Sequence, residues 1–150
     1  MAFIESSPIV ILAIACHVAG GAAGVFLARF FRRTGQAGTH LALTLAMVGG
    51  GFVSYLGAWY WQAPMLEPVT IASLVGELPG GFPALRFEMF VDRLGAFFLI
   101  LIGLLSALVA LYSFIWLRDK TNKNRIAGMY NLFVLAAWLM VIVNDVFLYL

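Results

Sequence analysis

The chain has 150 residues, of which 63% are hydrophobic and 11% charged, and its formal net charge is +2. Soluble domains carry about 25% charged residues, so this composition excludes an ordinary water-soluble fold and indicates a protein of the lipid bilayer. The single cysteine, Cys16, excludes an internal disulfide and any metal or iron–sulfur site built from several cysteines.

Four segments are apolar over the roughly 20 residues that a helix needs to cross the hydrocarbon core. They run from about 8 to 31, 40 to 62, 93 to 117 and 126 to 150. Because backbone groups inside a bilayer need hydrogen-bond partners within their own segment, helices rather than open strands are predicted. The sequence therefore predicts a single all-α integral membrane domain with four transmembrane helices.

The first predicted helix places His17 near mid-membrane, next to Cys16. An ionisable group at that depth is a candidate for an ion path. The more frequent case is a neutral imidazole that is hydrogen-bonded to a nearby carbonyl, and both interpretations stay open. Gly20 and Gly24 follow four residues apart, a spacing that lets two helix backbones approach closely.

The second predicted helix begins at His40 and repeats the small-residue spacing with Ala46 and Gly50. We interpret both small-residue pairs as helix packing, because a conduit would need polar groups that these segments lack. His17 and His40 are the only histidines, and their predicted depths differ by roughly 20 Å at 1.5 Å per residue. One haem iron cannot join them, which argues against a haem bound by both histidines. We expect no metal and no cofactor.

Basic residues predict the orientation. The first connection carries three of the nine Lys and Arg residues and the third carries four, with Asp119 as the only acid in either connection. Cytoplasmic loops are enriched in such cations, so we expect both connections inside the cell and both chain ends outside. The seven cations are Arg29, Arg32, Arg33, Arg118, Lys120, Lys123 and Arg125.

The second connection, from about 63 to 92, is too long for a simple turn. It contains the turn signal LPGGFP and then LRFEMFV, in which apolar and polar residues largely alternate. This pattern predicts a short β-hairpin on the outer membrane surface. The adjacent Asp92 and Arg93 are expected to form an interfacial charge pair at the start of the third helix.

The fourth predicted helix contains Asn144 and Asp145 near its outer end. Asp145 is the only acid inside the predicted spans, and it is either solvated or paired at the interface or part of a proton or cation site. A proton path across the membrane needs ionisable groups at several depths, which these spans do not supply. The sequence also lacks a phosphate loop, a nucleotide fingerprint and a nucleophile–base pair, and nothing in it indicates a nucleic-acid partner.

The segment from Leu85 to Leu150 resembles the start of the antiporter-like membrane subunits of respiratory complex I, Mrp-type antiporters and group 4 hydrogenases, most closely hydrogenase-4 component B of the formate hydrogenlyase type. The resemblance is carried by three short matches. They are DRLGAFF at 92–98, in which Arg93 and Gly95 depart from the commoner Pro and Ser, Leu-Tyr-Ser at 111–113, and the Asn144-Asp145 pair followed by Phe147 and Leu150.

The resemblance implies that the chain is the N-terminal part of a longer subunit and ends before the helices that carry that family's proton-handling Glu and Lys residues. The first two predicted helices match the family only in topology. The leading helices of such subunits act mainly as scaffold, in a prokaryotic inner membrane, beside other membrane and hydrophilic subunits. The complex as a whole couples electron transfer to proton or sodium translocation.

Two other functions remain open from the sequence. One is a complete small four-helix membrane anchor or assembly protein without transport. The other is a quinone- or haem-binding cytochrome anchor, against whose haem form the histidine depths argue.

Overall fold

The structure, a computed structural model, describes residues 2–30, 36–64, 69–74 and 85–143. Its helices are α1 (Ala2–Phe30), α2 (Ala37–Gln62), α3 (Arg93–Trp116) and α4 (Lys123–Ile142). Each contains a segment long and apolar enough to cross a membrane. The prediction of a multi-pass membrane protein with four apolar helices is therefore confirmed.

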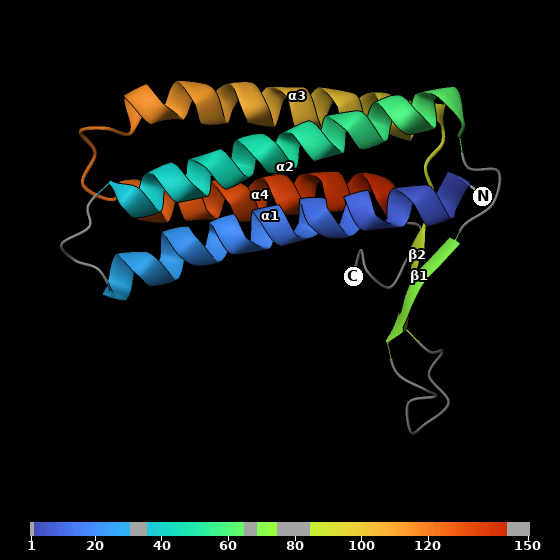
Figure 1. The fold of residues 1–150 in the computed structure, drawn as a ribbon, viewed down its shortest axis with the longest axis horizontal. Helices are drawn as coiled ribbons and strands as arrows, with labels where there is room; N and C mark the ends of the chain where they lie inside the picture. Colours follow the sequence, from blue (N-terminus) through green and yellow to red (C-terminus); the bar gives the residue numbers. More distant parts are fainter. Residues whose placement is uncertain (1, 31–35, 65–68, 75–84, 144–150) are drawn as a thin grey trace.

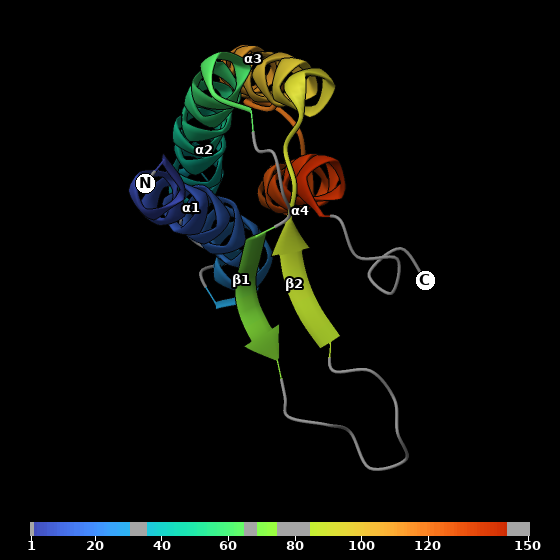
Figure 2. The ribbon, with the colours of Figure 1, turned by 90° about the vertical axis from the view of Figure 1, so that its right-hand side faces the viewer.

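Successive helices alternate in direction, so the chain runs back and forth along one bundle (Figure 1). The end of α1, the start of α2 and the α3–α4 connection lie at one end, which we call the loop end. The described strands lie at the opposite end, which we call the strand end. Viewed along the bundle, α1, α2 and α3 form an arc with α4 on its inner side (Figure 2).

Glycine residues bring α2 and α3 together. A Cβ on Gly50 would lie 2.7 Å from the Gly103 carbonyl oxygen, and one on Gly57 would lie 2.6 Å from the Ile100 nitrogen. Contact between α1 and α4 is equally close, because a Cβ on Gly128 would lie 2.9 Å from the Gly24 Cα. The interpretation of small residues as packing sites is confirmed for Gly24 and Gly50, where backbone contact replaces side-chain interdigitation.

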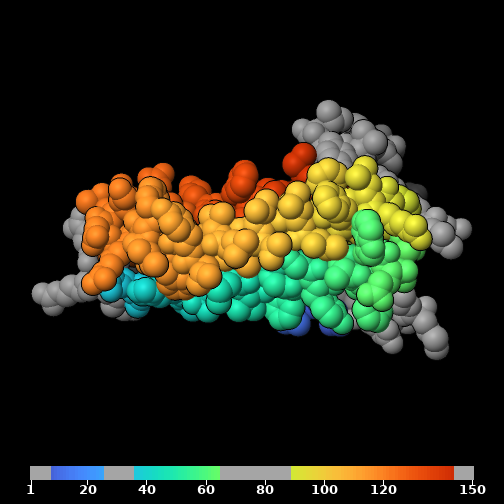
Figure 3. Space-filling model, turned by 90° about the horizontal axis from the view of Figure 1, so that it is seen from above, coloured from blue at the N-terminus to red at the C-terminus, as the bar shows by residue number. Residues whose placement is uncertain are grey.

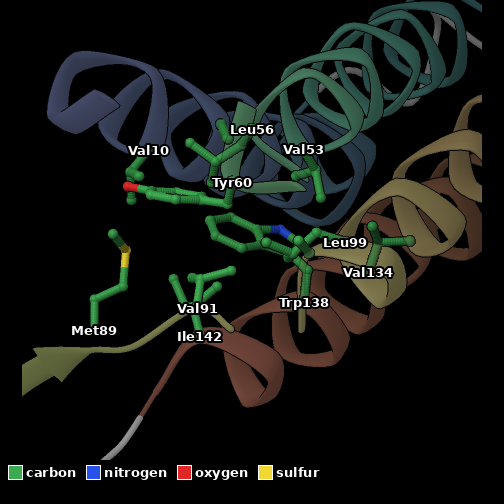
Figure 4. Packing of buried hydrophobic residues seen from close by; sticks show 12 residues of the cluster. Val10, Val53, Leu56, Tyr60, Met89, Val91, Leu99, Val134, Trp138 and Ile142 are labelled. Carbon is green, nitrogen blue, oxygen red and sulfur yellow. The ribbon is translucent and has the colours of Figure 1, made fainter. Parts of the chain in front are cut away.

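Large apolar side chains fill the strand end of the bundle (Figure 4). Trp138 of α4 and Tyr60 of α2 are almost completely buried there, together with Leu99 of α3. Met89 and Val91, which lead from the strands into α3, are buried in the same cluster. The segment before α3 therefore closes this end of the helix bundle.

Two antiparallel strands, β1 (Val69–Leu74) and β2 (Leu85–Met89), precede α3. They pair from Val69 with Met89 to Leu74 with Leu85, with one irregularity between Thr70 and Ala72. β2 occupies the segment in which the sequence alternates. The LPGGFP turn signal falls outside the described residues.

The strands are joined to α4 by backbone contacts. The Phe90 N–H donates to the Ile142 carbonyl at 2.9 Å, and Met89 forms an isolated bridge with Val143. Val143 has an extended backbone conformation, so α4 ends at Ile142, earlier than the predicted end at Leu150. Hydropathy could not detect this end, because most of the residues beyond it are apolar as well. Asn144 and Asp145 lie outside the described residues.

The predicted end of α2 at Gln62 and start of α3 at Arg93 are confirmed, but the starts of the other three helices differ from the apolar segments. α1 begins at Ala2, α2 at Ala37 and α4 at Lys123, whereas the sequence predicted 8, 40 and 126. Hydropathy measures only the part of a helix that suits hydrocarbon, and a helix can continue into the headgroup region.

Candidate functional site

A buried polar cluster lies between α1, α2 and α4. Within the described residues, no group of three or more His, Cys, Asp or Glu side chains is arranged to hold a metal ion. His17 of α1 and Asn131 of α4 are both fully buried. They are the polar residues that an apolar bundle is least able to solvate, so their partners define what the site can do.

Asn131 is held by two backbone carbonyls. Its Nδ2 donates to the Ala42 oxygen on α2 at 2.9 Å and to the Ala127 oxygen on α4 at 3.0 Å. With both amide hydrogens used in this way, Oδ1 is the atom that faces His17, and it lies 3.4 Å from the His17 Nδ1. A carbonyl oxygen only accepts, so the network assigns the hydrogen to Nδ1 of His17.

Two glycines make room for these polar side chains. A Cβ on Gly20 would lie 2.5 Å from the Asn131 Oδ1, and a Cβ on Gly49 would lie 2.8 Å from the His17 Nε2. Any larger residue at either position would displace the polar group that it faces. At Gly20 the small residue therefore makes room for the amide of Asn131 rather than for a second helix backbone.

The far side of the cluster contains two polar atoms without a hydrogen-bond partner among the described residues. They are the Nε2 of His17 and the Nε1 of Trp138, whose rings lie 6.4 Å apart between centroids at an interplanar angle of 48°. With the hydrogen on Nδ1, Nε2 is an acceptor, whereas the indole Nε1 is a donor. The network as assigned carries no charge and joins three helices at mid-bundle.

His40 belongs to different surroundings. It lies on α2, nine residues before the Gly49 that contacts His17, which places the two histidines roughly 14 Å apart along the bundle. Its ring stacks on Phe114 with centroids 5.4 Å apart. The structure thus supports the inference that one haem iron cannot join the two imidazoles, although the separation is shorter than the sequence estimate.

Asp92 caps the N-terminus of α3. Its Oδ1 accepts a hydrogen bond from the Gly95 N–H at 2.6 Å, which satisfies one of the free donors of the first turn. Arg93 is the first residue of the helix and is exposed. Among the residues that the structure describes, no ion pair joins the two side chains, so the contact of Asp92 is a helix cap. Asn144 and Asp145 cannot be placed relative to this cluster, since they lie outside the described residues.

Sequence reasoning identified His17 but missed Asn131 and Trp138. A signal was present for Asn131, because it is an amide inside an apolar span and a polar side chain there is expected to find a partner. Trp138 gave no such signal, since tryptophan is common in membrane helices. The partnership of residues 17 and 131 required the packing of α1 on α4.

No family model, curated protein or solved structure matches this chain. The resemblance to antiporter-like subunits therefore depends on the short matches in the sequence.

Proposed function

We propose that this chain supplies scaffold helices to an antiporter-like membrane subunit of an energy-converting oxidoreductase complex, of the group 4 hydrogenase or complex I type. In this proposal the complex couples electron transfer to proton or sodium translocation. The four helices anchor and support neighbouring subunits, in a prokaryotic inner membrane with the N-terminus outside. Asp145 and Asn144 remain the proposed ion-path residues near the outer boundary.

The observation that carries the scaffold role is the closed interior of the bundle. Backbones approach closely at Gly50 and Gly103, and Trp138 and Tyr60 fill the strand end. The polar network at mid-bundle holds His17 to Asn131 and continues into backbone carbonyls of α2 and α4. Such an interior favours a rigid support over a path for ions.

The outer face of α3 offers the surface for lipid or for a neighbouring subunit. Its side chains run the whole length of one face of the molecule (Figure 3). Large apolar residues remain exposed from one end of the helix to the other, a composition that suits a bilayer or another helix. They include Leu94, Phe97, Leu101, Leu104, Leu108, Leu111 and Ile115.

Co-purification from native membranes tests the assignment. An affinity tag on the chain, extraction in a mild detergent and a native gel should recover a complex that contains redox subunits with metal clusters. Recovery of the chain alone, or only as copies of itself, would contradict the proposal and favour the small membrane anchor.

The proposed orientation has a separate test that uses single cysteines. In a Cys16→Ser background, Thr121→Cys places a thiol in the α3–α4 connection and Ala63→Cys places one at the other end of the bundle. A membrane-impermeant maleimide added to spheroplasts should label Ala63→Cys and spare Thr121→Cys until the membrane is opened. The reverse pattern would refute the orientation without affecting the fold.

A further inference from the structure

We propose that a basic cavity at the loop end binds the phosphate headgroup of an anionic phospholipid. The cavity has a volume of about 310 Å³ and lies between the start of α2, the last turn of α3 and the start of α4. These segments meet at the end of the bundle that carries the α3–α4 connection (Figure 1). The site is separate from the His17–Asn131 cluster and does not depend on the proposed oxidoreductase complex.

Three basic residues line this cavity. Arg118, Lys123 and the imidazole of His40 all contribute to its wall. The Lys123 Nζ donates to the Arg118 carbonyl at 3.2 Å, which uses one of the three ammonium hydrogens and leaves two for a ligand. Guanidinium and ammonium groups together are a typical phosphate-binding set.

Acidic side chains that would neutralise the cavity are scarce along the neighbouring chain. The sequence contains no Asp or Glu between residues 6 and 66, and Asp119 is the only one between residues 93 and 144. Asp119 does not line the cavity, and it is exposed. The positive charge of Arg118 and Lys123 is therefore available to an anion.

Apolar side chains line the same cavity. Phe114, Ile115 and Leu117 contribute to the wall, and Ile115 is 79% exposed in the last turn of α3. His40 and Phe114 both line the cavity, and their rings stack on each other, so basic and apolar lining residues are in direct contact there. A phosphodiester that continues into an acyl chain matches this mixed lining, whereas a free phosphate would use only the cationic groups.

The position along the bundle agrees with a headgroup site. The cavity forms at the last turn of α3, where the apolar span ends at Trp116. Lys120 lies over the Trp116 ring at 5.0 Å from its centroid, an arrangement expected for an aromatic residue at the membrane interface. If the proposed orientation holds, this is the cytoplasmic leaflet, whose anionic lipids attract basic segments.

The experiment measures lipid binding to the purified full chain in a neutral detergent. Native mass spectrometry should detect a retained phosphatidylglycerol, and titration should raise the thermal unfolding midpoint. The double variant Arg118→Gln/Lys123→Gln should weaken the apparent Kd about tenfold or more, since each cation near a lipid phosphate contributes substantially to binding.

The matched control is Lys120→Gln/Arg125→Gln. It removes the same charge from the same end of the bundle but changes no residue that lines the cavity. The apparent Kd should therefore change much less than in Arg118→Gln/Lys123→Gln, because Lys120 and Arg125 are exposed to solvent and interactions of exposed charges are weakened by water and salt. Equal losses in both double variants would show diffuse attraction to charge and would overturn the proposal. Equal binding of phosphatidylcholine would overturn it too.

Two further measurements distinguish binding of lipid from binding of a free anion, and loss of binding from loss of folding. Inorganic phosphate and soluble glycerol phosphate should give little protection, and protection equal to that of the lipid would refute the lipid assignment. Arg118→Gln alone keeps the backbone carbonyl that accepts from Lys123, so its unfolding midpoint without lipid should match the wild type. An unchanged apparent Kd in this single variant would also refute the site.

Discussion

The two ends of the bundle differ in the size and polarity of their side chains. At the strand end, Trp138, Tyr60 and Leu99 are buried in one cluster with Met89 and Val91. There the Phe90 N–H, directly after β2, donates to the Ile142 carbonyl in the last turn of α4. At the loop end, the buried cluster is smaller and contains Ala42, Leu43, Leu117 and Ala127. Beside it lies the basic cavity, which leaves part of this end open to a ligand.

In this bundle the strand end provides rigidity, and the loop end provides the proposed binding site. Large side chains in close contact make the strand end costly to deform, because each buried contact is lost when the helices separate. The loop end relies more on polar contacts, such as the hydrogen bond from the Thr39 hydroxyl to the Asn124 amide oxygen. We therefore expect destabilisation to be greatest for substitutions at the strand end.

The largest expected effect is that of Trp138→Ala. Removing the fully buried indole opens a cavity among helices that cannot collapse completely, and such changes cost about 3–5 kcal/mol. Reversible unfolding in mixed detergent micelles, followed by circular dichroism, measures the free energy of unfolding. Phe133→Ala is the control on the same helix, because Phe133 is 70% exposed and its loss should have little effect.

Gly50→Ala tests the close approach of α2 and α3. The new methyl group would meet the Gly103 carbonyl oxygen at 2.7 Å, so the helices must move apart, at a cost of about 1–3 kcal/mol. The neighbouring Gly51 has no heavy atom within 4 Å of an added Cβ. Gly51→Ala should therefore be neutral or stabilising in the same unfolding assay, and equal destabilisation by both variants would contradict the packing of α2 on α3.

Asn131→Leu tests how much the polar cluster between the two ends contributes to the free energy of unfolding. It removes the donors to the carbonyls of Ala42 and Ala127 and the acceptor facing His17. Hydrogen bonds between membrane helices contribute about 0.6 kcal/mol each on average, so the total loss should be about 1 kcal/mol. A double-mutant cycle with His17→Phe should show coupling between the two positions, and strict additivity would mean that the hydrogen bond contributes nothing.

Asp92→Ala should have the smallest of these effects. Loss of the helix cap costs about 1 kcal/mol or less at an exposed position. Asp92→Asn should retain most of the stability, since an asparagine oxygen can also accept from the Gly95 N–H. A large loss in Asp92→Asn, matched by Arg93→Gln, would instead support the charge pair predicted from the sequence.

The amino-acid sequence by itself determined the number of apolar helices and their approximate positions, because spanning a bilayer requires a run of apolar residues that is readable in one dimension. Likewise, the small-residue spacing at Ala46 and Gly50 indicated a packing face. Polar partners were not predictable in this way: His17 and Asn131 are 114 residues apart, and apolar helices carry no local signal of which neighbour they contact. Tertiary structure alone decided that α4 packs against α1 and α2, that it ends where β2 meets it, and that Arg118 and Lys123 share a cavity with His40.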